Sequence, residues 1–391
     1  MAILDGSRFL AAVAVMLFHF TSRDHPSWGE SPSETFPLLS GFTAAGAFGV
    51  DLFFIISGFV ILMTAWGRDM PSYVTSRITR LFPAYWAGVL LTGFLLIVLW
   101  PGRKALDLTD VGVNLTMLQT AFEIQHVDGV YWTLWVELRF YVLLGILLLI
   151  GITGARVLAF ASMWPVAGAL AYTAEADLLA NLLIWNYAPL FAGGMALFVL
   201  TRDRRSVLAW LVLAQNVILS IAWSGLQTQA LIERNSGHAI STVACAAIVI
   251  TCFGLVMVGT LTRLRHLRTA WLTTAGLLTY PLYLLHEYWG WWIIDMLHDT
   301  LPRYVVLAIS MAVALALAWA VHLLVEKPLA PRLKRGLIEG FARLRAMDGA
   351  PADNLTRGAT RSGHPGERDG ASERGGAENP AFSAVTSPKA G

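Results

Sequence analysis

Charged residues are scarce in this chain of 391 residues, at 14% of the total, and cysteine occurs only twice. Ordinary globular proteins have about 25% charged residues, so the composition excludes a typical soluble domain. Cys245 and Cys252 lie seven residues apart in an apolar stretch, and we interpret them as packed or lipid-facing side chains. No basic stretch alternates with aromatic residues in the way that a nucleic-acid-binding face requires, so we expect no nucleic acid partner.

Two further features are missing. No basic region precedes the first apolar run and no small-residue cleavage site follows it, so we expect no cleavable signal peptide. We therefore expect the first apolar segment to stay in the protein. No internal repeat is obvious either, which disfavours a transporter built from inverted repeats.

Apolar residues make up 56% of the chain, and the mean hydropathy is +0.60. Together with 15 tryptophans and 10 tyrosines, which suit interfacial belts, this composition predicts an all-α polytopic membrane protein. Hydropathy predicts about ten transmembrane helices, at 7–22, 46–66, 82–100, 131–151, 154–174, 178–200, 207–225, 238–261, 270–296 and 304–325. The first of these is short and carries polar residues.

Basic residues predict the orientation of these helices. Those that follow the second, fourth, sixth, eighth and tenth segments are Arg68, Arg77, Arg80, Arg156, Arg202, Arg204, Arg205, Arg263, Arg265, Arg268, Lys327, Arg332, Lys334 and Arg335. The alternate connections are richer in acidic residues. Because basic residues near membrane ends stay in the cytoplasm, we predict that both termini are cytoplasmic.

The composition changes towards the end of the chain. We expect a transmembrane domain over 1–335 and a cytoplasmic tail over 336–391, disordered from about 348, where Gly, Ala, Ser, Arg, Glu and Pro dominate. The long outer connections 23–45 and 101–130 are candidates to cover an outer cavity. We expect the protein in a cell membrane, a bacterial inner or plasma membrane.

Arg8 and His19 lie on the first apolar segment. Ionisable groups within a bilayer are rare and are functional candidates. At 1.5 Å per residue they are separated by about 16 Å, roughly half of the hydrocarbon thickness. One helix therefore offers a cation near one leaflet and a proton-handling imidazole near the other.

The predicted orientation sorts the other polar residues by depth. Arginines gather inward, and imidazoles and carboxylates gather outward. The sorted residues are Arg8, Arg77 and Arg80 on the inner side, Ser57 in the middle, and His19, Asp51, Glu137 and His286 in the outer half. An inner cationic site suits a phosphate-bearing donor such as an acyl-coenzyme A. An outer group of histidine and carboxylate suits general-base activation of a hydroxyl.

Each of these residues also has a structural interpretation, which the sequence leaves open. The inner arginines set topology or reach the headgroups, as Arg77, Arg80 and Arg8 are placed to do. A histidine such as His19 forms interhelical hydrogen bonds, and Asp51 suits a helix start at the interface. His286, beside Glu287, is open to an interfacial or a catalytic role. We interpret Gly49 and Gly58 as sites of close helix contact.

Several segments together resemble the acyltransferase-3 family of membrane O-acyltransferases. They are LDGSR at 4–8 followed by His19, GVDLFFIISGF at 49–59, RITRLFPAYW at 77–86, WTLWVELRFY at 132–141, YPLYLLH at 280–286 and EKP at 326–328. Each motif is weak alone, but their order on ten helices is specific. The chain departs from the family pattern at Thr133, where Ser is commoner, and at Pro281, which is able to open the helix locally.

The resemblance implies transfer of an acyl group, usually acetyl, from cytoplasmic acyl-CoA to a hydroxyl of a carbohydrate or a small glycosylated acceptor. It implies roles in transfer for Arg8 and His19 and donor-side roles for Arg77 and Arg80. We add Glu137 and Asp51 as catalytic candidates that orient the His19 imidazole or contact the acceptor, and His286, Ser57 and Tyr283 as substrate contacts. We expect acetyl-CoA or another acyl-CoA as the donor, and no permanently bound cofactor or metal.

Other interpretations remain open at this stage. A proton-coupled transporter or flippase of glycan intermediates also uses intramembrane His, Glu, Asp and Arg. A covalent acyl-histidine intermediate is an alternative to direct transfer. A noncatalytic scaffold leaves the buried ionisable residues unexplained. An exported polysaccharide and a small hydroxylated metabolite such as a macrolide remain equal candidates for the acceptor.

Overall fold

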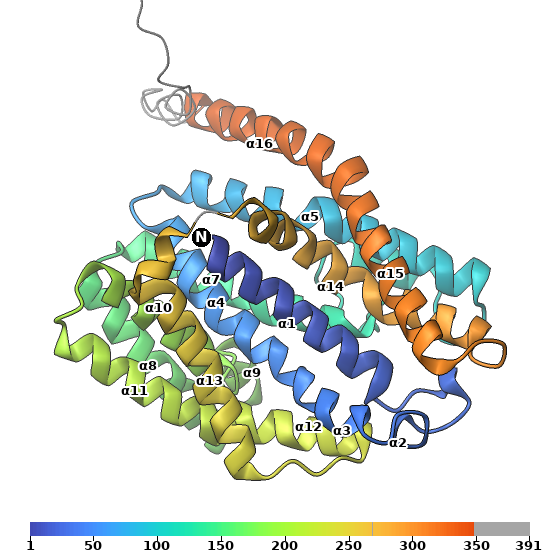
Figure 1. The fold of residues 1–391 in the computed structure, drawn as a ribbon. Helices are drawn as coiled ribbons and strands as arrows, with labels where there is room; N and C mark the ends of the chain where they lie inside the picture. The colour runs from blue at the N-terminus through green and yellow to red at the C-terminus, as the bar shows by residue number, and fades with distance from the viewer. Residues whose placement is uncertain (268, 348–391) are drawn as a thin grey trace, which may run out of the picture. The chain divides into compact units, whose positions relative to one another are not determined.

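The computed structural model describes residues 1–267 and 269–347, and within these ranges all regular structure is helical (Figure 1). Among the described residues, eight helical stretches are long and apolar enough to cross a membrane. The prediction of an all-α polytopic membrane protein is therefore confirmed. The side of the membrane on which each terminus lies stays a prediction.

Each of the ten predicted segments overlaps a helix, although the segment 178–200 is divided between the short helix α9 (Asp177–Leu182) and α10. The ten helices are α1 (Ala2–Thr21), α4 (Gly49–Ala65), α5 (Met70–Phe94), α7 (Trp132–Ile150), α8 (Gly154–Thr173), α10 (Ala188–Arg202), α11 (Val207–Leu219), α13 (Thr242–Leu261), α14 (Ala270–Leu297) and α15 (Arg303–Val321). Two of them are not among the eight stretches: α10 has only 15 residues, and α14, with 28, carries His286, Glu287 and Asp295. Helix α14 runs unbroken through Pro281, so the proline does not end it.

The connections contain short helices. They are η1 (Pro26–Trp28), α2 (Pro32–Thr35), α3 (Leu39–Thr43), η2 (Ala44–Phe48), η3 (Leu95–Leu99), α6 (Leu108–Asn114), η4 (Gly129–Tyr131), α9 (Asp177–Leu182), η5 (Ser220–Gly225), α12 (Leu226–Ser236), η6 (Arg263–His266) and η7 (His322–Glu326). Helix α16 (Lys327–Met347) closes the described chain.

Two helices extend well beyond the hydropathy segments. Helix α5 begins at Met70, where the carboxylate of the N-cap Asp69 accepts a hydrogen bond from the Ser72 backbone N–H. Arg77 and Arg80 therefore lie within the helix and not in a connection before it. The π-helical turn η5 joins α11 to α12, and α12 occupies the stretch after residue 225 where hydropathy predicted a connection.

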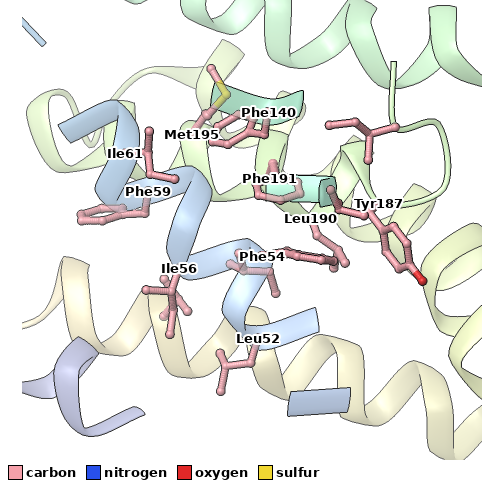
Figure 2. Close-up of a cluster of buried hydrophobic side chains, with 14 of the residues drawn as sticks. Leu52, Phe54, Ile56, Phe59, Ile61, Phe140, Tyr187, Leu190, Phe191 and Met195 are labelled. Atoms are coloured by element: carbon pink, nitrogen blue, oxygen red, sulfur yellow. The ribbon is translucent and has the colours of Figure 1, made fainter. Parts of the chain in front are cut away.

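A large hydrophobic core lies between α4, α7 and α10 (Figure 2). Phe191 of α10 stacks on Phe54 of α4, with ring centroids 4.7 Å apart, and on Phe140 of α7, at 4.4 Å. All three side chains are buried. Offset aromatic pairs of this kind add to the packing energy, so this core fixes how α4 and α7 face each other.

Glycines permit the closest helix contacts. A Cβ at Gly58 of α4 would collide with the Phe191 carbonyl, and one at Gly194 of α10 with the Ile55 carbonyl. A Cβ at Gly49 would meet the Ala11 carbonyl of α1 at 2.7 Å. The interpretation of Gly49 and Gly58 as close-contact positions is confirmed, and small residues serve this purpose widely in membrane helices.

Helix α1 packs against both α4 and α14, as Figure 1 shows. Its contact with α14 is close at both ends: Gly276 lies against Asp5, and Gly290 against the Phe20 ring. This arrangement brings the C-terminal end of α1 next to the middle of α14. It thereby decides which residues become the neighbours of His19.

Internal contacts divide the chain into residues 1–341 and 342–391. Of the second unit the structure describes 342–347, the end of α16. The disordered tail predicted from about 348 and the basic residue Arg268 lie outside the described residues. Cys245 and Cys252 are free and buried, in agreement with a packing role.

Candidate active site

Two histidines from distant parts of the chain meet near the C-terminal end of α1. The Nδ1 atom of His19 lies 2.9 Å from Nε2 of His286 on α14. The other ring nitrogen of His286, Nδ1, lies 2.9 Å from the Tyr283 carbonyl oxygen and 3.2 Å from that of Leu282. Both imidazoles are buried.

These contacts determine which ring nitrogen of His19 and of His286 carries the proton when both imidazoles are neutral. A carbonyl oxygen only accepts, so His286 donates from Nδ1–H, and its Nε2 must be the acceptor. His19 then donates from Nδ1–H, which leaves Nε2 of His19 with a free lone pair. Nε2 of His19 has no partner among the described residues. His286 thus holds His19 in the tautomer that a general base requires.

The structure corrects two expectations about this group. Asp51 and Glu137 do not orient the His19 imidazole; His286 does. His286, expected to contact the substrate, uses both ring nitrogens within the protein. The indole N–H of Trp291 also donates to the His19 carbonyl oxygen, at 3.1 Å, and this bond holds the last turn of α1 against α14.

His19 lines a pocket of about 130 Å³, together with Asp51, Trp132, Tyr187 and Thr228. We name it the outer pocket after the predicted orientation. Asp51 is in the first turn of α4 and is 1% exposed. Its Oδ2 accepts a long hydrogen bond, 3.5 Å, from the Thr228 hydroxyl of α12. Its Oδ1 is buried and has no partner among the described residues.

Arg23, which lines the outer pocket, is held in an ion pair behind the pocket wall. The Arg23 guanidinium donates to Oε1 of Glu287 at 2.6 Å, and the Glu287 carboxylate is 1% exposed. Asp128, also fully buried, lies beside Glu287 at the start of η4. Burial raises the pKa of Asp128 well above its usual value, and the neighbouring Glu287 raises it further. The charges of this wall are therefore compensated within the protein.

A second pocket, of about 190 Å³, is lined by the three predicted arginines, Arg8, Arg77 and Arg80. We name it the inner pocket after the same prediction. Arg77 donates to the hydroxyls of Thr64 and Ser76, and Arg80 lies 3.9 Å from the Glu326 carboxylate. Among the described residues, no hydrogen bond or ion pair holds the Arg8 guanidinium.

Glu137 belongs to this inner pocket, which corrects the expectation that all carboxylates gather outward. Its Oε1 accepts hydrogen bonds from the Ser57 hydroxyl at 3.0 Å and from the Tyr141 hydroxyl at 2.7 Å. Hydropathy placed Glu137 in the outer half of its helix but gave no information on the face that it occupies. The pocket thus combines three guanidinium groups with one carboxylate held by two hydroxyls.

Tyr283 and Val50 line both pockets. The Tyr283 hydroxyl lies 2.9 Å from Oγ1 of Thr133, and its ring contacts Phe53. A single tyrosine and a valine therefore form the wall between the cationic pocket and the histidine pocket. Of the residues predicted from sequence, Arg8, Arg77, Arg80, Ser57, Glu137 and Tyr283 line the inner pocket, and His19, Asp51 and Tyr283 the outer one.

Sequence reasoning missed several pocket residues. Thr228, Leu231 and Asn235 of α12 line the outer pocket at spacings of three and four residues, a helical pattern that could have been recognised. Arg23 was assigned only to an acidic outer connection, and nothing in the sequence pairs it with Glu287. The described residues contain no group of three or more His, Cys, Asp or Glu side chains able to hold a metal ion.

Comparison with protein families adds one finding. The family model described as an acyltransferase domain, acyltransferase-3, matches residues 1–323. The match covers all residues that line the two pockets and the pair of His19 and His286, but not Glu326. No curated protein and no solved structure matches the chain.

Proposed function

We propose that this chain, which belongs to the acyltransferase-3 family and is an acyltransferase of the membrane O-acyltransferase type, transfers an acetyl group from cytoplasmic acetyl-CoA. In this proposal the acceptor is a hydroxyl of a glycan or of a small glycosylated compound at the extracytoplasmic side. The observation that carries the proposal is the pair of pockets on either side of Tyr283 and Val50. One pocket is rich in guanidinium groups, and the other holds a base.

The inner pocket suits the donor. Guanidinium groups bind phosphate oxygens through charge-assisted hydrogen bonds, often two at a time. Arg8, which has no partner of its own among the described residues, is best placed to gain from an anionic ligand. In the proposal the phosphates of acyl-CoA bind Arg8, Arg77 and Arg80, and the thioester points towards Tyr283.

The outer pocket suits the acceptor. Nε2 of His19 takes the proton from the acceptor hydroxyl, whose oxygen attacks the thioester carbonyl. The carbon–sulfur bond breaks as the tetrahedral intermediate collapses, and the leaving thiolate takes the proton back from His19. No net proton is released. His286 is a positioning residue, because it acts only through its hydrogen bond to His19.

Glu137 has a different role from the one expected for a residue beside His19. Its carboxylate faces the arginines of the inner pocket, and Ser57 and Tyr141 fix its oxygen. In the proposal Glu137 orients the Arg8 side chain towards the donor. It therefore contributes to donor binding and not to proton transfer.

The test separates this function from that of a proton-coupled transporter or flippase. Purified protein in lipid nanodiscs is titrated with acetyl-CoA, and the double variant Arg77→Gln/Arg80→Gln is compared with the wild type. Loss of two charge-assisted contacts should weaken binding by about 100-fold or more. Arg156→Gln serves as the matched control, since Arg156 bonds only the carbonyls of Ile150 and Gly151. A transporter of glycan intermediates would neither bind nor consume acetyl-CoA.

A further inference from the structure

The Asp51 carboxyl has an oxygen atom, Oδ1, that the proposed transfer mechanism does not use. Its carboxyl is 1% exposed and lines the same outer pocket as His19. Thr228 occupies Oδ2, at 3.5 Å, and Oδ1 has no partner among the described residues. Buried polar atoms are almost always hydrogen-bonded, so an unpaired buried carboxyl oxygen in a pocket points to a ligand that donates a hydrogen bond.

Aromatic rings form the wall near Asp51. Trp132 and Tyr187 line the pocket and contact each other, with ring centroids 5.5 Å apart and an angle of 35° between their planes. The faces of aromatic rings carry partial negative charge and attract the polarised C–H groups of a sugar ring. Helix α12 also lines the pocket, through Thr228, Leu231 and Asn235. The pocket is therefore lined both by apolar ring faces and by polar side chains that form hydrogen bonds.

The charges of the pocket favour a neutral ligand. Arg23, the cation in its wall, is already paired with Glu287 at 2.6 Å. An anionic acceptor would thus meet the Asp51 carboxyl without a free cation to balance it. A simple apolar alcohol would use His19 but leave Oδ1 of Asp51 unpaired. A ligand with at least two hydroxyl groups satisfies both residues.

We propose that the outer pocket binds one polyhydroxylated ring of the acceptor. His19 takes the proton from one hydroxyl of this ring, and Oδ1 of Asp51 accepts a hydrogen bond from a second hydroxyl. Asp51 thereby selects which hydroxyl is acylated. The proposal rests on the proposed function. Thr228 is a positioning residue, since it fixes the Asp51 carboxyl through Oδ2.

The experiment compares two kinds of acceptor with acetyl-CoA as donor. The probes are a panel of methyl pyranosides and cyclohexylmethanol, which has a ring of similar size and a single hydroxyl. In the wild type the best pyranoside should exceed cyclohexylmethanol in kcat/KM by about 10- to 100-fold, the cost expected for leaving a buried carboxyl oxygen without a hydrogen-bond donor. Asp51→Asn should lower this ratio by about tenfold or more and change the proportions of the product regioisomers.

Two further variants make the result decisive. Asp177→Asn makes the same chemical change at an exposed position and should leave the ratio unchanged. If Asp51→Asn does not fold, Thr228→Val, which keeps the size of the side chain but loses the hydroxyl, should lower the ratio several-fold. An unchanged ratio in the folded pocket variants would overturn the proposal.

Binding of the pyranosides without donor, measured by saturation-transfer NMR on the same nanodiscs, separates this proposal from the proposed function. Acetylation of alcohols without a preference that depends on Asp51 overturns the subsite and leaves the acyltransfer function standing. Binding that depends on Asp51 without acetylation supports the subsite and contradicts the transfer reaction. Absence of both binding and acetylation for every pyranoside overturns the subsite.

Discussion

The two pockets differ in how their charges are balanced. In the inner pocket Arg80 lies 3.9 Å from the Glu326 carboxylate, whereas Arg8 and Arg77 have no ion-pair partner among the described residues. In the outer pocket Arg23 is paired with Glu287, and the histidines are bonded to each other. Uncompensated positive charge prepares the first pocket for an anion, whereas the second is arranged for proton transfer between neutral groups.

This difference has an energetic consequence. An unpaired charge in a partly buried site destabilises the fold, and a ligand of opposite charge removes that cost. A paired charge such as Arg23 supports the fold, since its loss leaves a buried carboxylate alone. Substitutions in the inner pocket should therefore affect binding more than stability, and substitutions in the outer ion pair should do the reverse.

His19→Ala tests the catalytic side of the comparison and should have the largest effect. Removal of a general base lowers a rate by about 100- to 10,000-fold, so acetyl transfer should fall by that factor while acetyl-CoA binding is unchanged. Initial rates and donor titrations check both quantities. His238→Ala, at an outer histidine that lines neither pocket, is the control. Transfer at the wild-type rate would contradict the assignment.

Arg8→Gln tests the cationic side. The loss of one charge-assisted hydrogen bond of about 1.5–3 kcal/mol should raise the Kd for acetyl-CoA by about 10- to 100-fold. The thermal stability of the donor-free protein should stay the same or rise, because no protein group loses a partner. Calorimetric titration and a melting curve on the same sample test both. A large loss of stability would show that Arg8 is structural.

His286→Gln tests whether the second histidine acts through the first. Because His286 only orients His19, kcat should fall by about 10- to 100-fold, the range for outer partners of a reactive group, with the KM for acetyl-CoA unchanged. The split between kcat and KM distinguishes this role from a loss of folding. A rise in the donor KM with constant kcat would place His286 in substrate binding instead.

Arg23→Gln should have the opposite effects to those expected for Arg8→Gln: a loss of stability with no change in donor binding. It leaves the Glu287 carboxylate, 1% exposed, without its cation, while Arg23 itself is 31% exposed. We expect a loss of stability of about 1–3 kcal/mol, lower than for a fully buried pair because solvent screens the guanidinium. The Kd for acetyl-CoA should be unaffected. Equal stability in the two arginine variants would remove the distinction between the pockets.

Asp128→Asn should have the smallest effect, and one that depends on pH. The pKa of Asp128 is raised in the folded protein, so its contribution to stability is present at low pH and is lost as pH rises through the folded pKa. Asparagine does not titrate and still accepts from the Val130 N–H. The Tm advantage of the variant should be small near about pH 4 and larger near about pH 8. A constant difference between the two Tm values across this range would contradict the assignment.

Much of the fold and part of the site could be read from the sequence. The ten apolar segments all overlap helices, and Arg8, Arg77 and Arg80 share one pocket as expected. Helix α12 was missed because its residues are too polar for a hydropathy window, although their spacing fits a helix. Glu137 was grouped with His19 and not with the arginines because depth along a helix does not tell which neighbour it faces.

The sequence alone determined where the chain enters and leaves an apolar environment, because hydropathy and charge are sums over neighbouring residues. Only the tertiary structure decided that His286 holds His19 and that Tyr283 separates the two pockets, since these contacts join residues more than 100 positions apart. These contacts depend on close helix packing at glycines such as Gly290. They also depend on how each helix is rotated about its axis, since successive side chains of a helix point in different directions. The sequence therefore shows which charged residues the chain has, whereas the packing of the helices decides which of them interact.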